Sequence, residues 1–220
     1  MAQGYVRSSD LPQVIPVFPL PGAIILPRGQ LPLNIFEPRY LNMIDDAMAG
    51  ERLIGMIQTA GPLSERPPLV RVGCAGRITS FAETSDGRYL ITLTGISRFR
   101  IATELQVTTP YRQVRADFEP YADDLEGPDA FEGLDRERFL DALAPYLAAR
   151  GLDIDWDTAK AAPAEALINS LSMGLPFEPA EKQALVEAPD LRDRCEVLTA
   201  LLQIDGAGGA SDEDTPPRVQ

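Results

Sequence analysis

The spacing of apolar residues changes partway along this 220-residue chain, and no other feature restricts the possible fold as much. Up to residue 118, apolar and polar residues alternate in several short segments, such as 89–94 and 114–118. A period of two is typical of strands with one buried face. Beyond residue 130, apolar residues recur at the 3.6-residue spacing of helices. The sequence therefore predicts an α+β fold, with a curved antiparallel β-sheet followed by a helical bundle.

Proline and glycine mark the expected element ends in the first half. Prolines recur through 14–33, so strands there should be short, bent or at a sheet edge. Pro38 suits the first position of a helix, and Gly50 suits its end. The segment Ser85-Asp86-Gly87 predicts a hairpin turn between two strands.

Prolines also divide the helical half. Apolar residues in 131–147 share one helical face, and Pro145 inside that pattern predicts a kink or an early end. A second helix is expected over 158–173. The further prolines expected to restart or begin a helix are Pro163, Pro179 and Pro189.

Charge is divided unequally between the two halves. Residues 1–115 carry 12 Arg and 9 Asp or Glu, whereas residues 116–220 carry 8 Lys or Arg and 24 Asp or Glu. Such asymmetry indicates two structural units. We expect a β-rich subdomain over 1–118, an acidic linker over 119–130, a helical bundle over 131–205 and a disordered tail over 206–220.

The residues required for the common catalytic chemistries are missing. The chain contains no histidine, which excludes Ser-His-Asp and Cys-His catalysis and histidine metal ligands. Lys160 and Lys182 are its only lysines, and neither follows a glycine as a phosphate-binding loop requires. The isolated Cys74 and Cys195 are interpreted as core residues. We therefore expect no enzyme activity, no cofactor and no metal site.

An acidic run in the second half resembles the opening of a calcium loop. Asp153, Asp155 and Asp157 have the required spacing, but the glycine and glutamate that complete such a loop are absent from their positions. A helix N-cap at Asp157 explains the run better.

Nothing in the sequence indicates a membrane. No apolar run reaches the roughly 18 residues that span a bilayer. The start of the chain lacks the pattern of a signal peptide. Two cysteines do not form a disulfide framework, which fits a reducing compartment. A soluble, cytoplasmic protein is expected.

Three blocks carry a resemblance to a known family. The first block runs through 15–20 and 31–40, the second is 72–78, and the third runs from 86–90 to 95–101. In order and spacing they resemble the N-terminal substrate-recognition domain of Lon proteases, which belong to peptidase family S16. The chain is most similar to the stand-alone bacterial LON-domain proteins, which lack the ATPase and protease domains.

The resemblance implies a PUA-like curved sheet or pseudo-barrel with one helix, followed by a helical bundle. It also implies a non-catalytic module that binds unfolded or extended protein segments, or that acts as an adaptor in proteolysis and quality control beside a protease or chaperone. RNA or nucleotide binding by the β half is the alternative, because PUA-like folds often bind RNA.

Residues of the blocks are the candidate binding residues. They are Phe36, Glu37, Arg39, Tyr40, Arg77, Arg98 and Phe99. A structural role competes with this one. Phe36 and Tyr40 are also expected as core anchors, and Arg77 and Arg98 as partners of the Glu37 carboxylate.

Overall fold

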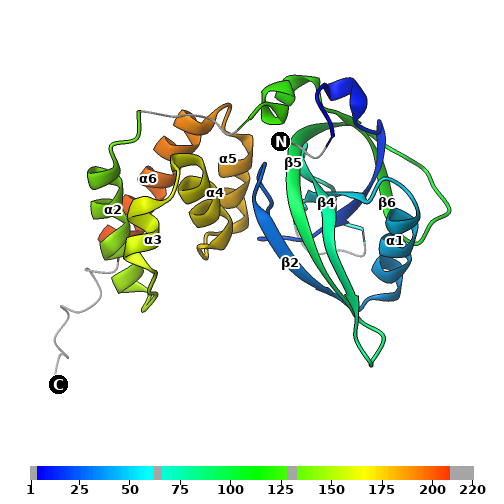
Figure 1. Cartoon of the computed structure of the whole chain (residues 1–220), viewed down its shortest axis with the longest axis horizontal. Coiled ribbons are helices and arrows are strands. Elements are labelled where there is room, and N and C mark those ends of the chain that lie inside the picture. The colour runs from blue at the N-terminus through cyan, green and yellow to red at the C-terminus, as the bar shows by residue number, and fades with distance from the viewer. Residues whose placement is uncertain (1–3, 62–65, 128–132, 209–220) are drawn as a thin grey trace, which may run out of the picture. The chain divides into compact units, whose positions relative to one another are not determined.

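The computed structural model describes residues 4–61, 66–127 and 133–208 (Figure 1). The chain divides into two compact units. Unit 1 comprises Met1–Asp129 and Asn169–Glu187, and unit 2 comprises Ala130–Ile168 and Ala188–Gln220. Each unit therefore combines two separate stretches of sequence.

Within the described residues, six strands form one mixed sheet in unit 1. The strands are β1 (Val14–Pro19), β2 (Gln30–Ile35), β3 (Leu53–Ile57), β4 (Val72–Glu83), β5 (Tyr89–Glu104) and β6 (Arg112–Asp117). Their order is β2-β5-β4-β3-β1-β6. Strands β1 and β3 are parallel, and the other neighbours are antiparallel. The α+β class is confirmed, but a wholly antiparallel sheet is wrong, because the chain crosses over between β1 and β3.

The sheet is strongly curved, as the alternating sequence pattern predicts. Strand β5 pairs with β2 and β4, and its last residues also pair with β6 at the other end of the strand order. Register shifts interrupt the β4–β5 ladder between Ala75 and Gly76 and between Ile78 and Ser80. Such bulges bend a strand and increase its twist. One long strand can therefore contribute to both ends of the strand order.

The proline-rich strands take the predicted forms. Strand β1 is only six residues long, and β2 lies at the edge of the sheet with Pro32 near its middle. The Asp-Gly hairpin is also confirmed, because Gly87 adopts a φ of 79° in the turn between β4 and β5. Figure 1 shows this hairpin extending past the rest of the sheet.

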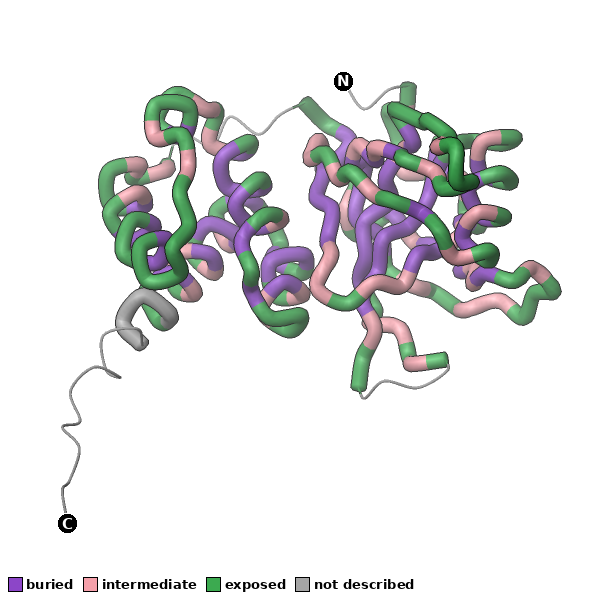
Figure 2. The backbone as a smooth tube through the Cα atoms, turned by 90° about the horizontal axis from the view of Figure 1, so that it is seen from below, coloured by how far each residue is buried: buried purple, intermediate pink, exposed green. Residues whose placement is uncertain are grey.

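Helix α1 (Pro38–Ala49) closes the main core of unit 1. Its buried face carries Tyr40, Met43, Ile44 and Ala47, at the i, i+3, i+4, i+7 spacing of an amphipathic helix. These residues pack in one cluster with apolar side chains from β1 to β5, including Cys74. Figure 2 shows the buried residues concentrated along these strands. The predicted start and end of this helix are confirmed.

Two stretches of the helical half belong to the sheet-containing unit. Helix α5 (Pro179–Glu187) and the part of α4 (Ala164–Gly174) from Asn169 onward lie in unit 1. The Gln183 side chain donates to the Val72 carbonyl at 3.0 Å, and Val186 packs against Ile24, Leu26 and Val72. These helices therefore pack on an apolar cluster of the sheet-containing unit, although the sequence pattern assigns them to a separate bundle.

Every secondary-structure element formed by the described residues of unit 2 is a helix. Unit 2 contains α2 (Arg136–Ala149), α3 (Trp156–Ala161), the first turn of α4 and α6 (Leu191–Gly208). Pro145 lies inside α2 without ending it. Leu191, Cys195, Leu198 and Leu202 form a buried stripe on α6, so Cys195 is a core residue as expected. Burial raises the pKa of its thiol. Asp155 caps α3 by accepting from the backbone of Asp157 and Thr158, so the predicted cap at Asp157 is wrong by two residues.

The expected linker differs from the structure. Residues Glu119–Leu125 form the 3-10 helix η2, and both Asp124 and Leu125 are buried within unit 1. Hydrogen bonds and apolar contacts hold this segment on the sheet, although its composition resembles a linker. Residues 128–132 lie outside the described residues. The expected tail begins at 206, but α6 continues to Gly208, and 209–220 again lie outside the described residues.

Candidate functional site

The structure separates Phe36 from the core. Its side chain is 63% exposed, so the expectation of a core anchor is wrong at this position. The guanidinium of Arg88 lies 6.0 Å from its ring centre. Tyr40, in contrast, is buried, and its ring centre lies 4.3 Å from that of Phe18. Burial is the main cause that raises the pKa of Tyr40. Tyr40 is thus a core anchor, as expected.

The Glu37 carboxylate pairs with Arg39 on the same helix end. Arg39 donates to it from Nε at 3.1 Å and from Nη2 at 2.8 Å. Both side chains are nearly half exposed. The expectation that Arg98 holds this carboxylate is therefore wrong. Arg77 is half buried in β4, opposite Leu53 of β3.

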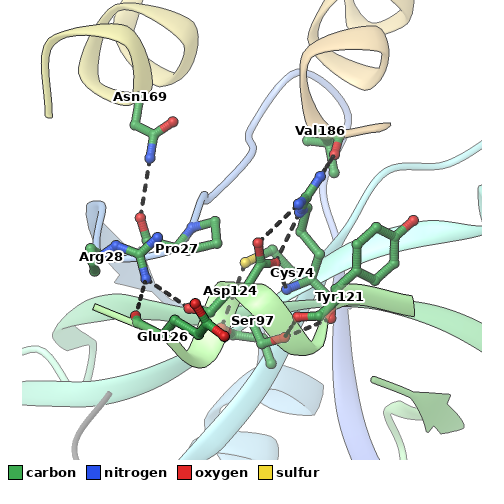
Figure 3. Close-up of polar contacts among 11 residues, drawn as sticks. Pro27, Arg28, Cys74, Ser97, Tyr121, Asp124, Glu126, Asn169 and Val186 are labelled. Atoms are coloured by element: carbon green, nitrogen blue, oxygen red, sulfur yellow. Dashed lines mark hydrogen bonds and ion pairs between the residues drawn. The ribbon is translucent and has the colours of Figure 1, made fainter. Parts of the chain in front are cut away.

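Arg98 is instead the centre of a buried network in unit 1. Figure 3 shows its partners Asp124, Tyr121 and Val186. Its Nε and Nη2 donate to the two carboxylate oxygens of Asp124, each at 2.9 Å. Its backbone N–H also donates to Asp124 at 2.8 Å, and its Nη1 donates to the Val186 carbonyl at 3.3 Å. Its guanidinium lies 4.6 Å from the ring centre of Tyr121. Arg98 thus joins β5, η2 and α5. Because its side chain is buried and its donors bond to these segments, it is poorly placed to bind a ligand.

Phe99 fills the middle of the sheet core and is fully buried. A Cβ atom at Gly55 or at Gly73 would lie 2.9 Å from the end of its ring. These two glycines therefore make room for the ring, and Phe99 has no surface to offer a partner.

A cleft in unit 1 contains residues that the sequence did not single out. Its volume is about 310 Å³. Its lining consists of Pro19, Pro21, Arg39, Tyr40, Thr59, Arg66, Pro67, Val107, Thr109, Pro110, Tyr111 and Arg112. Three arginines and no Asp or Glu appear among these residues. Of the expected site residues, only Arg39 and Tyr40 belong to it.

One carboxylate behind the lining orients two of the arginines. Glu104 accepts from Arg112 at 2.6 and 2.9 Å and from Arg66 at 2.6 Å. Arg112 also donates to the Pro67 carbonyl at 2.7 Å. The hydrogen bonds from Arg112 are the main cause that lowers the pKa of Glu104. Sequence spacing could not reveal this cluster, because its members lie on separate segments.

A second feature is an apolar tip at the end of the sheet, defined here by Phe36, Phe81 and Leu90. Leu90 is 46% exposed and Phe81 is 41% exposed. Leu90 pairs with Asn34 in the β2–β5 ladder, so Phe36, two residues beyond Asn34, lies on the same face. Phe81 pairs with Ile91 on the other face. The apolar tip thus exposes large apolar side chains on both faces of the sheet.

The described residues contain neither a cluster of metal-ligating side chains nor a membrane-spanning helix. In the described part of the chain, no group of three or more His, Cys, Asp and Glu side chains is placed to hold a metal ion. No helix among the described residues is both long and apolar enough to cross a membrane.

Comparison with solved structures gives the class of the protein. A crystal structure of a Lon N-terminal domain protein from Xanthomonas campestris is similar with a TM-score of 0.60 and 23% identity, covering 85% of this chain and 97% of that one. The N-terminal domain of a Mycobacterium avium complex Lon protease matches with a TM-score of 0.58 and 20% identity, covering 86% of this chain and 97% of that one. The fold is that of a Lon N-terminal domain.

Comparison of sequences gives the family. Residues 14–203 match the substrate-binding domain of ATP-dependent protease La (LON), and the chain belongs to this family of substrate-recognition domains. Lon protease 2 of Myxococcus xanthus is 27% identical over 212 residues, which cover 90% of this chain but 24% of that protein. The Lon protease of Syntrophus aciditrophicus is 31% identical over 113 residues, which cover 49% of this chain and 14% of that protein. The chain therefore spans about a quarter of the length of the Myxococcus relative.

Proposed function

We propose that this chain recognises unfolded or extended protein segments and presents them to a protease or chaperone in the cytoplasm. The apolar tip is the observation that carries this proposal. Exposed Phe and Leu side chains can bury the apolar side chains that a client exposes on unfolding, at roughly 25 cal/mol per Å² of buried apolar surface. Membership of the substrate-binding family supports the same function.

The edge of the sheet beside the apolar tip suits an extended client. Strand β2 is the edge strand, and it ends one residue before Phe36. An extended segment can add to such an edge through backbone hydrogen bonds. Pro32 lacks a backbone N–H and interrupts the edge, which discourages pairing between two copies of the chain.

The other candidate residues receive different roles in this proposal. Phe36 contacts the client, and Arg39 acts at the neighbouring cleft. Tyr40, Arg98 and Phe99 are buried and support the surface from within, and Tyr40 also lines the cleft. Glu37 orients Arg39 through the pair described above.

Nucleic-acid binding is the less favoured function. The sequence offered it because PUA-like folds often bind RNA. Within the β half, Arg98-Phe99-Arg100 is a segment in which a ring lies between two cations. The structure buries Phe99 and uses Arg98 in the Asp124 pair, so only Arg100 of that segment is exposed. A stacking platform for bases requires exposed rings.

Substitutions in the apolar tip are expected to weaken client binding. Combining Phe36→Ser with Leu90→Ser should raise the dissociation constant for an unfolded, reduced client about tenfold, or roughly 1.4 kcal/mol. A flexible client covers the two side chains only in part, so the loss is smaller than the roughly 1.5–3 kcal/mol that full burial of each side chain contributes. Fluorescence anisotropy with a labelled client measures the change. The matched control is Leu152→Ser in unit 2, a similarly exposed leucine outside the apolar tip. Equal weakening by both variants would contradict the assignment of the surface.

The purified chain is expected to show no ATPase and no peptidase activity. The sequence offers no phosphate-binding loop for ATP hydrolysis. It also offers no histidine, and no serine and lysine spaced as a catalytic pair, for peptide hydrolysis. Assays of phosphate release and of casein cleavage measure both activities. Turnover that co-purifies with the chain and disappears when one of its residues is replaced would contradict this expectation.

A further inference from the structure

We propose that the cleft beside Arg39 binds an acidic side chain of an extended client segment, together with an apolar side chain next to it. This inference rests on the proposed function and adds a chemical preference to it. The cleft and the apolar tip are separate sets of residues, so their contributions can be measured separately.

The cleft concentrates positive charge in an acidic protein. Arg39, Arg66 and Arg112 line it, and none of the other described lining residues is an Asp or a Glu. The chain as a whole carries a net charge of -13. The planar guanidinium group binds carboxylates through paired hydrogen bonds. A carboxylate is therefore the ligand group that this lining fits best.

Donors remain available on two of the arginines. Arg39 uses Nε and Nη2 on Glu37, and Arg66 uses Nη2 on Glu104. Each of these two side chains thus uses only some of its N–H donors in hydrogen bonds to described protein groups. Both side chains are about half exposed, at 48% and 57%. Ion pairs this exposed are weak, so a client carboxylate can share or replace their partners at little cost.

The third arginine and the apolar lining give the cleft its shape. Arg112 is only 14% exposed and is fixed by Glu104 and by the Pro67 carbonyl. Pro19, Pro21 and Val107 supply apolar surface beside the guanidinium groups. A volume of about 310 Å³ lies at the small end of ligand pockets, which suits one or two side chains.

The same geometry disfavours a nucleotide base. Base binding without sequence readout depends on stacking against exposed rings. Tyr40 and Tyr111 are both buried, and the ring of Tyr40 is covered by Phe18 and by the guanidinium of Arg39 at 4.6 Å. Two buried rings provide no open face for a base, whereas the arginines offer hydrogen bonds.

Because the whole chain is acidic, a preference for a glutamate peptide over a glutamine peptide would point to a local cationic site. A net charge of -13 repels acidic peptides at long range. A local cationic site must therefore cause any preference for a glutamate peptide over its glutamine counterpart.

The test uses the full chain and two labelled peptides with blocked ends. One contains leucine–glutamate–phenylalanine, and the other has glutamine in place of glutamate. Anisotropy titrations should give about fivefold tighter binding of the glutamate peptide, as expected for one partly exposed ion pair. The double variant Arg39→Gln/Arg66→Gln should reduce this ratio to about one. The control Arg71→Gln/Arg100→Gln removes the same charge from exposed positions outside the cleft and should keep the ratio.

Several results would overturn the inference. These are equal binding of both peptides by the native chain, a preference that survives in Arg39→Gln/Arg66→Gln, and tight binding of a glutamine peptide only when its C-terminus is free. Displacement of the glutamate peptide by a short RNA would assign the cleft to nucleic acid instead. If both peptides bind equally and Phe36→Ser weakens both, the cleft inference fails while the proposed function stands. If neither peptide nor an unfolded client binds, both fail.

Discussion

Replacing Asp124 with alanine is expected to lower the free energy of unfolding by about 3–5 kcal/mol. The substitution leaves the Arg98 guanidinium buried without its carboxylate and also removes the acceptor of the Arg98 backbone N–H. When a buried charge loses its partner, no ion pair offsets the free-energy cost of removing that charge from water. Urea unfolding followed by circular dichroism measures the loss.

The adjacent carboxylate provides the control. Asp123 is exposed, and Asp123→Ala should change the free energy of unfolding by less than about 0.5 kcal/mol. The double variant Arg98→Met/Asp124→Leu should be more stable than Asp124→Ala alone, since it removes both buried charges. If Asp124→Ala proves no more costly than Asp123→Ala, the network does not hold η2 on the sheet.

A methyl group at Gly95 is expected to cost more than about 4 kcal/mol, enough to lower the yield of folded protein. A Cβ atom there would lie 1.9 Å from the carbonyl oxygen of Leu26. The two backbones are held together, because the Gly95 N–H donates to Gly29 and the Gly95 carbonyl accepts from Arg28, both at 2.8 Å. A backbone oxygen fixed in this way cannot move aside as a flexible side chain could.

Gly127→Ala is the matched control for this substitution. Among the described residues, no heavy atom beyond its chain neighbours lies within 4 Å of the Cβ position at Gly127. The change should therefore cost less than about 0.5 kcal/mol. Urea unfolding of both variants measures the difference. A Gly95→Ala protein as stable as Gly127→Ala would show that the segment before β2 is not pressed against β5.

Local signals made part of the fold predictable from the sequence. Pro38 and Gly50 bound α1, and Asp86-Gly87 forms the hairpin turn, because each signal acts through the backbone of its own residues. The family resemblance, carried by three ordered blocks, predicted the α+β class that the fold comparisons support.

Long-range packing decided what the sequence could not reveal. Arg98 finds its carboxylate 26 residues away on a segment whose composition resembles a linker. Helix α5 has the period of a bundle helix, but its Val186 joins an apolar cluster on the sheet. The three arginines of the cleft lie on separate segments. Composition and periodicity carry no information on such pairings.

Phe36 shows the limit most clearly for the candidate site. An aromatic residue directly after a strand is usually buried, and the sequence supported that role equally for Phe36 and Tyr40. The structure buries Tyr40 and exposes Phe36, because Tyr40 lies on the inward face of α1 and Phe36 lies beyond the last pair of β2 with β5. Phe36, for which the sequence left a binding role and a core role open, is thus the side chain that the proposed function uses.

The native chain is expected to bind unfolded protein. The most direct measurement is an anisotropy titration of the full chain with a reduced, unfolded client and with a short RNA, each at low and high salt. Binding dominated by apolar burial should persist at high salt, whereas RNA binding should be weak and fall steeply. Modest client affinity is expected, because ordering a flexible segment costs several kcal/mol. No client binding, together with tight and salt-sensitive RNA binding, would contradict the claim and support a nucleic-acid module instead.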